Sequence, residues 1–415
     1  MKNLANLRFE LGSDAIGPLT LDEYQLHAKL TYRGNVKETE RFDFLLLGLY
    51  GEVGSLLSEL KKKQRDRGAY TAYASSAIEE TGDVLWYLAN VADAAGYALS
   101  DLAIACGIFS TGGASRTFAD MEPQAALFEE PASSGAVQQC LLELAARTGQ
   151  VVRRAREETQ LSLALRGDFA RVFEALIAAA EQAHVSLERA AIDNLDKLLD
   201  RWPLRRDWGA LYDDGFHPDE RFPRRLEVVF RERKVGGTTY AFQSINGVNV
   251  GDRLTDNSTG ADDYRFHDVF HLAFAGTLGW SPVLRALLKV KRKSVGAVDE
   301  QQDGARAIIT EEGISNWLFA HGLRHQAFEH VDSLDFALLK TVRAMVQGYE
   351  VENRPLWMWE EAVLRGFATF RELKRHRGGI VTIDLEARTI DYRRHPLDSS
   401  VSALIGNDAV VADPI

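Results

Sequence analysis

The sequence predicts a mainly α protein, in which an all-α bundle of two tandem helical repeats is followed by an α+β domain. Three observations predict this fold class. Apolar residues recur with helical spacing over residues 41–66 and 75–95. A fainter copy of the same pattern follows a stretch rich in Gly, Ser and Pro. Beyond Trp202-Pro203, paired β-rich segments predict two β-hairpins among further helices.

These patterns divide the 415 residues into four segments. They are a first repeat (1–110), a linker (111–136), a degenerate second repeat (137–204) and the α+β domain (205–415).

Composition restricts the class of protein. The net charge is −11 at pH 7, which argues against a protein that coats nucleic acid. Only two cysteines occur, so a disulfide framework is excluded and a reducing, cytoplasmic setting is expected. The N-terminal residues lack the apolar stretch of a signal peptide, and no apolar run reaches membrane-spanning length.

The first repeat begins with a capping box, in which Thr20 precedes a helix and Glu23 stands three residues later. Its last helix begins near Leu99. Residues 92–103 align with residues 180–191 of the second repeat.

In this register the second copy has lost most of its acids. Asp168 stands for Glu80 and Arg171 for Asp83, and a shorter connection between the two helices puts Arg147 in the place of Glu52. The last helix of the second copy instead carries three polar residues where the first copy has Cys106, Phe109 and Gly113. These are Asn194, Lys197 and Arg201.

The C-terminal domain is expected to contain two hairpins. Residues 226–233 and 238–243 flank Gly236-Gly237, and residues 380–384 and 388–392 form the second pair. The helices expected between them span residues 261–278, 282–293, 303–325, 333–348 and 355–376.

Carboxylates in the first repeat form the main candidate site. Glu52 and Glu59 lie about two helical turns apart, and Glu80 and Asp83 also share one helix face. Their neighbours are mostly apolar, and acids held beside a core need a cation. Several converging oxygens suit a hard ion such as Mg²⁺. The alternatives are solvated helix acids and, for Glu59, an ordinary ion pair with Lys63.

The residues Gly48-Leu49-Tyr50-Gly51-Glu52-Val53-Gly54, Lys61-Lys62 and Glu79-Glu80-Thr81-Gly82-Asp83-Val84-Leu85-Trp86-Tyr87-Leu88 resemble the MazG-like, all-α nucleoside triphosphate pyrophosphohydrolases. The resemblance covers the first quarter of the chain well and the next quarter weakly. It implies a helical homo-oligomer that cleaves a nucleoside triphosphate to the monophosphate and pyrophosphate. It also implies Mg²⁺ as cofactor, with Mn²⁺ as a substitute.

The same resemblance assigns roles to single residues. Glu52, Glu80 and Asp83 match the family's metal-binding and catalytic acids, and Glu59 is a further candidate ligand. Gly51 looks like a variant of one branch of the family, whereas Ser55 stands where a carboxylate is expected. The phosphate-binding Asn-x-x-Lys and later Arg occur only in the second copy. The expected substrate-binding residues are therefore Lys62, Asn194, Lys197, Arg201 and Gln25.

We therefore expect one composite site per chain, with metal ligands from the first copy and a phosphate clamp from the second. For Lys197 and Arg201, surface cations near a helix C-terminus are an equal alternative. For Gln25 an ordinary helix face is an equal alternative. The rival function is a catalytically weakened nucleotide-binding sensor, which regulates a C-terminal effector. That effector would be a metal-dependent hydrolase or a module that contacts nucleic acid.

The C-terminal domain carries a second, weaker candidate site. His267 and His271 lie one helical turn apart, and Glu311 and Glu312 follow on another expected helix, a set that suits Zn²⁺ or Fe²⁺. Histidines satisfied in a core or at the surface are the favoured reading, because no fixed spacing joins the two helices. The basic run 289–293 is read as a solvated helix end in preference to a phosphate or nucleic-acid contact.

Overall fold

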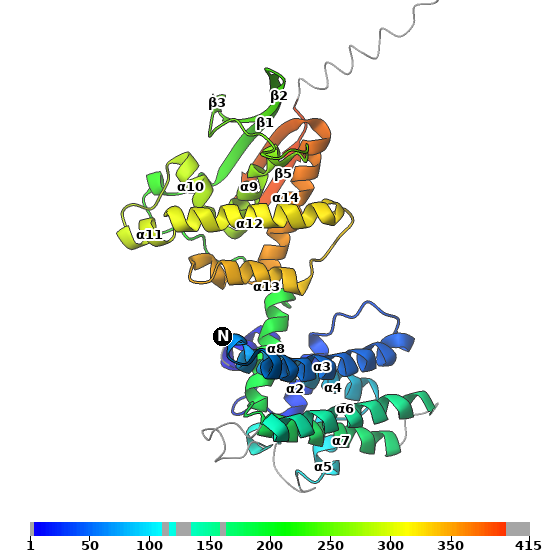
Figure 1. The fold of residues 1–415 in the computed structure, drawn as a ribbon. Helices are drawn as coiled ribbons and strands as arrows, with labels where there is room; N and C mark the ends of the chain where they lie inside the picture. Colours follow the sequence, from blue (N-terminus) through cyan, green and yellow to red (C-terminus); the bar gives the residue numbers. More distant parts are fainter. Residues whose placement is uncertain (1–3, 110–115, 122–133, 158–162, 396–415) are drawn as a thin grey trace, which may run out of the picture. The chain divides into compact units, whose positions relative to one another are not determined.

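The computed structural model describes residues 4–109, 116–121, 134–157 and 163–395, and the chain divides into two units, Met1–Arg205 and Arg206–Ile415 (Figure 1). The described part of the first unit is all-α apart from one isolated β-bridge, and the second combines helices with a five-stranded antiparallel sheet. The predicted mainly α class is confirmed. None of the helices in the described ranges is both long and apolar enough to cross a membrane.

The first unit contains the following helices: α1 (Leu4–Leu11), α2 (Leu21–Leu30), α3 (Glu38–Asp66), α4 (Tyr73–Ala94), α5 (Leu99–Ala105), α6 (Ser134–Glu157), α7 (Leu163–Gln182) and α8 (Leu187–Arg201). Thr20 caps α2 by accepting a hydrogen bond from the Glu23 N–H at 3.1 Å. The Glu23 carboxylate does not complete the expected capping box, because it pairs with Arg8 at 2.6 and 2.7 Å.

Two long helical hairpins build the core of this unit. Helices α3 and α4 pack along each other, and so do α6 and α7. Each hairpin is followed by a shorter helix that packs on the other hairpin, since α5 lies on α7 and α8 lies on α4. As a result, side chains more than 100 positions apart in the sequence meet between α4 and α8.

Part of the expected linker belongs to the core of the first unit. Thr117 forms an isolated antiparallel bridge with Thr20, and the Phe118 side chain is fully buried against Tyr24, with 5.4 Å between ring centroids. Residues 111–115 and 122–133 of that linker lie outside the described residues. The segment 116–121 therefore contributes to the core of the first unit. The turn-rich composition of the linker did not predict this.

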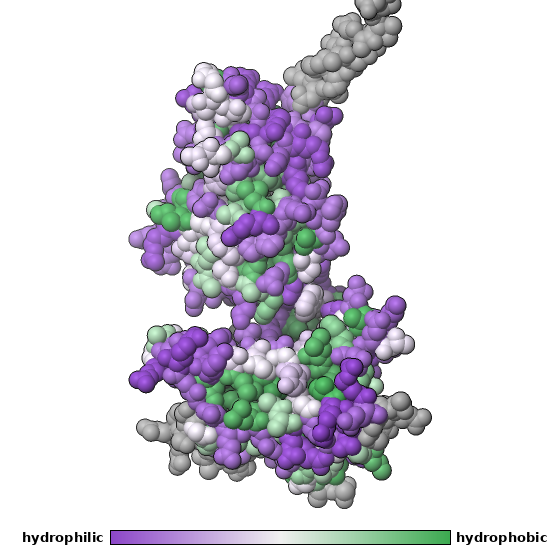
Figure 2. All heavy atoms as spheres, turned by 45° about the vertical axis from the view of Figure 1, so that its right-hand side comes forward, coloured by the Kyte–Doolittle hydropathy of each residue, from purple (hydrophilic) through white to green (hydrophobic). Residues whose placement is uncertain are grey.

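Large apolar side chains are also exposed on the first unit. Figure 2 shows hydrophobic residues gathered on its visible face. Leu47 is 74% and Tyr50 is 52% exposed on α3, and Leu26 is 56% exposed on α2.

The sheet of the second unit joins both predicted hairpins. Its strands are β1 (Arg225–Val235), β2 (Thr238–Ile245), β3 (Val248–Asn249), β4 (Gly378–Asp384) and β5 (Thr389–Arg393), in the spatial order β3-β2-β1-β4-β5. Gly236 and Gly237 both have positive φ (57° and 89°), as the tight β1–β2 turn requires. The two hairpins are joined by antiparallel pairing of β1 with β4, in which Val228 lies opposite Val381.

Helices cover the sheet and enclose the second core. They are α9 (Asp268–Leu278), α10 (Pro282–Leu288), α11 (Gly296–Gln301), α12 (Ala305–Arg324), α13 (Phe336–Met345) and α14 (Leu356–His376). Helices α9 and α14 pack against each other and against β4 and β5 (Figure 1). Gly366 permits this contact, because a Cβ there would lie 2.9 Å from the Phe270 ring.

The basic run 289–293 is not a solvated helix end. Helix α10 ends at Leu288, five residues earlier than expected, and Lys289 adopts a left-handed conformation (φ 64°) that turns the chain. Arg292 then enters the protein interior, where its side chain is 1% exposed.

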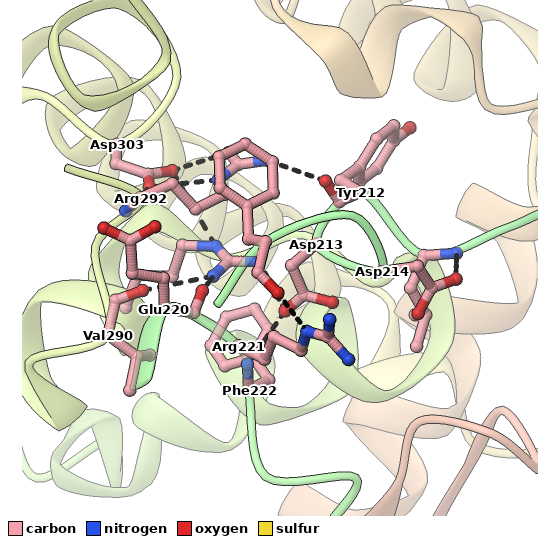
Figure 3. Close-up of polar contacts among 12 residues, drawn as sticks. Tyr212, Asp213, Asp214, Glu220, Arg221, Phe222, Val290, Arg292 and Asp303 are labelled. Carbon is pink, nitrogen blue, oxygen red and sulfur yellow. Dashed lines mark hydrogen bonds and ion pairs between the residues drawn. The ribbon is translucent and has the colours of Figure 1, made fainter. Parts of the chain in front are cut away.

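A buried network of arginines and carboxylates orders this part of the second unit (Figure 3). Arg292 forms bidentate ion pairs with Asp303, at 2.7 and 3.1 Å, and with Glu350, at 2.7 and 2.9 Å. Asp213 accepts hydrogen bonds from Arg285 (2.9 Å) and Arg224 (2.8 Å). Buried charges are stable only when paired and hydrogen-bonded in this way.

We predict that Asp213→Asn destabilises the second unit by about 3 kcal/mol at pH 7, because it removes the carboxylate that accepts hydrogen bonds from the buried Arg285 and from Arg224. Burial would raise the pKa of Asp213, but the Phe222 N–H and the guanidinium groups of Arg224 and Arg285 hold it below its ordinary value. The carboxylate therefore stabilises the fold above about pH 4, and this contribution is lost as the pH falls through the lowered pKa.

The measurement is urea unfolding of the full chain at pH 7 and pH 3.5. Asp214→Asn is the matched control, because Asp214 is exposed and pairs with the same Arg224 at 2.9 Å. Asp214→Asn should lower the free energy of unfolding by less than about 1 kcal/mol. Equal losses for the two variants would contradict the prediction.

Candidate active site in the first unit

Three carboxylates converge between α3 and α4. Glu52 extends from α3, and Glu80 and Asp83 extend from α4. One oxygen from each lies within 4.8 Å of one from each of the others, a spacing at which a single cation can bind all three. The structure thus brings together the three acids that the sequence singled out.

Asp83 is also held by α8. Lys197 Nζ donates to the two Asp83 oxygens at 2.5 and 2.6 Å, and Asn194 Nδ2 donates to Asp83 Oδ1 at 2.6 Å. Lys197 Nζ lies 3.4 Å from Glu79 Oε1 as well. The acidic cluster and two of the expected phosphate-binding residues therefore form one site.

Gly82 lets α8 approach α4 closely enough for these contacts. A Cβ at Gly82 would lie 2.6 Å from the Ala190 carbonyl oxygen and 2.9 Å from Asn194 Cβ. Neither distance is compatible with a real Cβ, and the nearer atom belongs to the backbone of α8. Only glycine fits at this crossing, one residue before Asp83.

The site carries an excess of negative charge. Burial, and then repulsion from Asp83 and Glu52, raise the pKa of Glu80 to about 7. Burial, and then Asp83, also raise the pKa of Glu52, although Lys197 and a hydrogen bond from Ser55 oppose this. Burial raises the pKa of Asp83 despite its bonds to Lys197 and Asn194.

A divalent cation fits this set of groups. Burial would lower the pKa of Lys197, but Asp83 and Glu79 raise it, so its ammonium group stays charged. One ammonium does not balance Glu52, Glu80, Asp83 and Glu79. The three carboxylates therefore still repel one another. Carboxylate oxygens are also the hard ligands that Mg²⁺ prefers.

The other expected site residues make contacts outside the group of three acids. Glu59 is 5% exposed, and its carboxylate accepts hydrogen bonds from Lys62, at 2.6 Å, and from the Tyr70 hydroxyl. It does not belong to the group of three acids, and its partner is Lys62 rather than Lys63. Lys62 still lies near enough to Glu80 for that carboxylate to raise the pKa of Lys62, after the larger effect of Glu59.

Gln25 does not line a base pocket through its amide, because the core uses it. Its Nε2 donates to the carbonyl oxygens of Ala89 (3.1 Å) and Tyr97 (2.9 Å), and its Oε1 accepts from the Leu99 N–H at 2.9 Å. These bonds tie α2 to α4 and to the start of α5. Arg201 lies one turn beyond Lys197 with its guanidinium over the Trp202 ring, 4.4 Å from the centroid.

Two residues at the site, Glu79 and Tyr24, were not assigned to it from the sequence. Glu79 contacts Lys197. Ser55, which stands where the resemblance implies a carboxylate, hydrogen-bonds Glu52. The Tyr24 hydroxyl is fully buried, has no hydrogen-bond partner in the described part of the chain, and lies near enough to Asp83 for that carboxylate to raise its pKa, after the larger effect of burial. The position of Glu79 next to Glu80 was the one available signal, since Tyr24 resembles any core aromatic residue.

The second candidate set also comes together, within the second unit. His267 and His271 lie at the start of α9, and Glu311 and Glu312 lie on α12. His271 Nδ1 is 2.8 Å from Glu311 Oε1, and His271 Nε2 is 3.5 Å from Glu312 Oε2. The spacing between the helices, which the sequence could not supply, is therefore short.

Comparison with known proteins finds one match in the second unit. Residues 208–396 match the family model "MazG C-terminal domain". The chain is also 33% identical over 79 residues to the "Gene 37 protein" of Mycobacterium phage L5, which is 18% of this chain and 69% of the phage protein. It therefore belongs to the same family as that protein. No solved structure matches the chain.

We predict that Gly82→Ala lowers the thermal stability of the first unit and separates Lys197 from Asp83. The added methyl group must displace the backbone of α8, and overpacking of this kind costs about 1–3 kcal/mol. Gly54→Ala is the control, because a Cβ there meets nothing within 4 Å. In an open helical position, alanine should stabilise by up to about 1 kcal/mol.

The readout is the thermal unfolding midpoint of the full chain. Opposite shifts for the two variants are expected. An unchanged or higher midpoint for Gly82→Ala would show that α8 does not depend on this contact.

Proposed function

We propose that this protein is a Mg²⁺-dependent nucleotide pyrophosphohydrolase, and the match of residues 208–396 to the MazG C-terminal domain model supports this proposal. The proposed reaction cleaves a nucleoside triphosphate between its α- and β-phosphates and releases the monophosphate and pyrophosphate. The family match suggests a role of this kind for the chain. The single observation that carries the proposal is the cluster of Glu52, Glu80 and Asp83 beside Lys197.

Each residue has a role in this proposal. Glu52, Glu80 and Asp83 hold the cation. When bound, Mg²⁺ neutralises phosphate charge and acidifies the attacking water. Lys197 orients Asp83 and supplies a positive charge at the edge of the cluster, where the phosphate chain would lie. Asn194 keeps Asp83 in place through its amide.

We further propose that the first unit is a tandem repeat with one working site. Each hairpin is followed by a shorter helix, and in both cases this helix packs on the other hairpin, α5 on α7 and α8 on α4. At the counterpart of Glu80, Asp168 is buried and forms ion pairs with Arg154 and Arg171. The guanidinium groups hold the pKa of Asp168 below its ordinary value despite its burial. They thus supply the positive charge that a cation would supply in the first hairpin.

A second candidate function is a nucleotide-binding sensor with little turnover. It is favoured by Ser55, which stands where a carboxylate is expected and donates a hydrogen bond to Glu52. A site with one ligand fewer can bind a nucleotide and still hydrolyse it slowly.

We predict that the wild-type protein releases pyrophosphate from one or more nucleoside triphosphates with Mg²⁺, and that Glu80→Gln lowers the rate at least about 100-fold. Loss of a ligand removes several kcal/mol of charge stabilisation, and each 1.4 kcal/mol is about tenfold in rate. Asp168→Asn changes the proposed counterpart of Glu80 and should leave the rate within about twofold below its unfolding temperature.

The assay measures pyrophosphate from a panel of ribo- and deoxyribonucleoside triphosphates with Mg²⁺ or Mn²⁺. Tight nucleotide binding without release by the wild type would favour the sensor over the enzyme. Release that survives Glu80→Gln would sink the proposed site.

We predict that Lys197→Ala weakens Mg²⁺-nucleotide binding by about 10- to 100-fold, since hydrogen bonds to charged groups contribute about 1.5–3 kcal/mol. Lys61→Ala is the matched control, because Lys61 is exposed on α3. Isothermal titration with a non-hydrolysable nucleotide gives both affinities. If Lys197→Ala binds as tightly as Lys61→Ala, the first copy binds nucleotide without α8.

A further inference from the structure

A second group of potential metal ligands lies in the second unit, at the start of α9. His267 and His271 stand one helical turn apart, and Asp268 lies between them in sequence. One ligand atom from each of the three lies within 4.8 Å of one from each of the others. Both imidazole Nε2 atoms also approach the same oxygen of Glu312 on α12, at 3.8 Å from His267 and 3.5 Å from His271.

The far side of each imidazole is held by an acceptor. His267 Nδ1 lies 2.9 Å from the Tyr264 carbonyl oxygen, and His271 Nδ1 lies 2.8 Å from Glu311 Oε1. A carbonyl or carboxylate oxygen at Nδ1 selects the tautomer with hydrogen on Nδ1. Both Nε2 lone pairs then face the space beside Glu312, which is how histidine ligands are oriented in metal sites.

The supporting residues are themselves fixed. Glu311 is fully buried, and it accepts hydrogen bonds from the Ser281 hydroxyl (2.7 Å) and the Val283 N–H (2.8 Å). The Gln243 side-chain amide donates to Asp268 Oδ2, which leaves Oδ1 facing His267. Tyr264 stacks on the His267 ring, with 4.1 Å between centroids. The ligand atoms are therefore preorganised.

One buried atom of the cluster has an ion-pair neighbour, Glu312 at 3.5 Å, but no hydrogen-bond partner among the described residues. This atom is His271 Nε2. A buried polar atom left in this way costs about 1–3 kcal/mol. Its nearest polar neighbour is a carboxylate oxygen, and with hydrogen on Nδ1 these are two acceptors facing each other. A cation bound by both atoms would satisfy the unpaired nitrogen and would also end the repulsion between the two acceptors.

We propose that His267, His271, Asp268 and Glu312 bind one divalent transition-metal ion, with Glu311 and Tyr264 as positioning residues. Two imidazole nitrogens select Zn²⁺, Fe²⁺ or Co²⁺ over Mg²⁺, unlike the all-oxygen cluster of the first unit. The Asp268 side chain is 23% exposed and that of Glu312 is 43% exposed. The site is thus open on its carboxylate side, as catalytic metal sites are and closed structural zinc sites are not.

The test is a Co²⁺ titration of the full chain after treatment with EDTA, followed by visible absorption, with Zn²⁺ as competitor. The wild type should bind one Co²⁺ with the spectrum of a nitrogen-containing site, and Zn²⁺ should displace it. The double variant His267→Gln/His271→Gln should weaken this binding at least about 100-fold. Glu311→Gln, which changes a positioning residue, should weaken it about 10- to 100-fold.

Two controls separate this site from other sources of Co²⁺ binding. His321 and His325 form another close pair in the same unit, with 4.6 Å between ring centroids, so His321→Gln/His325→Gln should bind Co²⁺ as the wild type does. Glu80→Gln should also leave the nitrogen-containing spectrum unchanged, because it affects only the first unit. If the double variant at 267 and 271 does not fold, Glu312→Gln replaces it, since that side chain is partly exposed.

Two results would overturn the proposal. The first is a wild type that binds no more Co²⁺ than the His267→Gln/His271→Gln variant, which would mean that the cluster is an imidazolium paired with two glutamates. The second is an equal loss of binding in the His321→Gln/His325→Gln control.

Discussion

The close crossing of α4 and α8 is the contact on which the candidate active site depends. Gly82 has no Cβ, so the Ala190 carbonyl can lie where a methyl group would otherwise be. The next residue, Asp83, then meets Lys197 and Asn194. A larger residue at position 82 would separate the acids from the cation that partly balances them.

Charge balance explains the difference between the two hairpins of the first unit. In the first, Glu52, Glu80 and Asp83 lie near one ammonium group, that of Lys197, and burial and nearby carboxylates raise the pKa values of all three acids despite it. In the second, Asp168 meets two guanidinium groups, and its pKa is lowered. The first arrangement is suited to binding a cation, whereas in the second the two guanidinium groups already supply the positive charge.

The same reasoning separates the two polar clusters of the second unit. Asp213, Arg285, Arg292 and Asp303 are buried, but their charges are paired with bidentate or multiple hydrogen bonds, as a structural network requires (Figure 3). In the histidine cluster the residues behind the imidazoles are equally well bonded, yet in the described part of the chain His271 Nε2 is buried without a hydrogen-bond partner, 3.5 Å from Glu312. The first cluster has its charges paired within the protein, whereas the second is the one that we propose binds a metal ion.

The sequence by itself determined the features that depend on local patterns. Helical periodicity and the Gly236-Gly237 turn predicted the mainly α class and both hairpins, and the spacing of Glu80 and Asp83 placed two acids on one helix face. Only the tertiary structure decided what meets across long separations. The pairing of β1 with β4, the use of Gln25 in the core and the pairing of Arg292 with Glu350 all depend on contacts between distant segments. Periodicity specifies which face of an element is buried, whereas the partner of that face is set by packing of the whole unit.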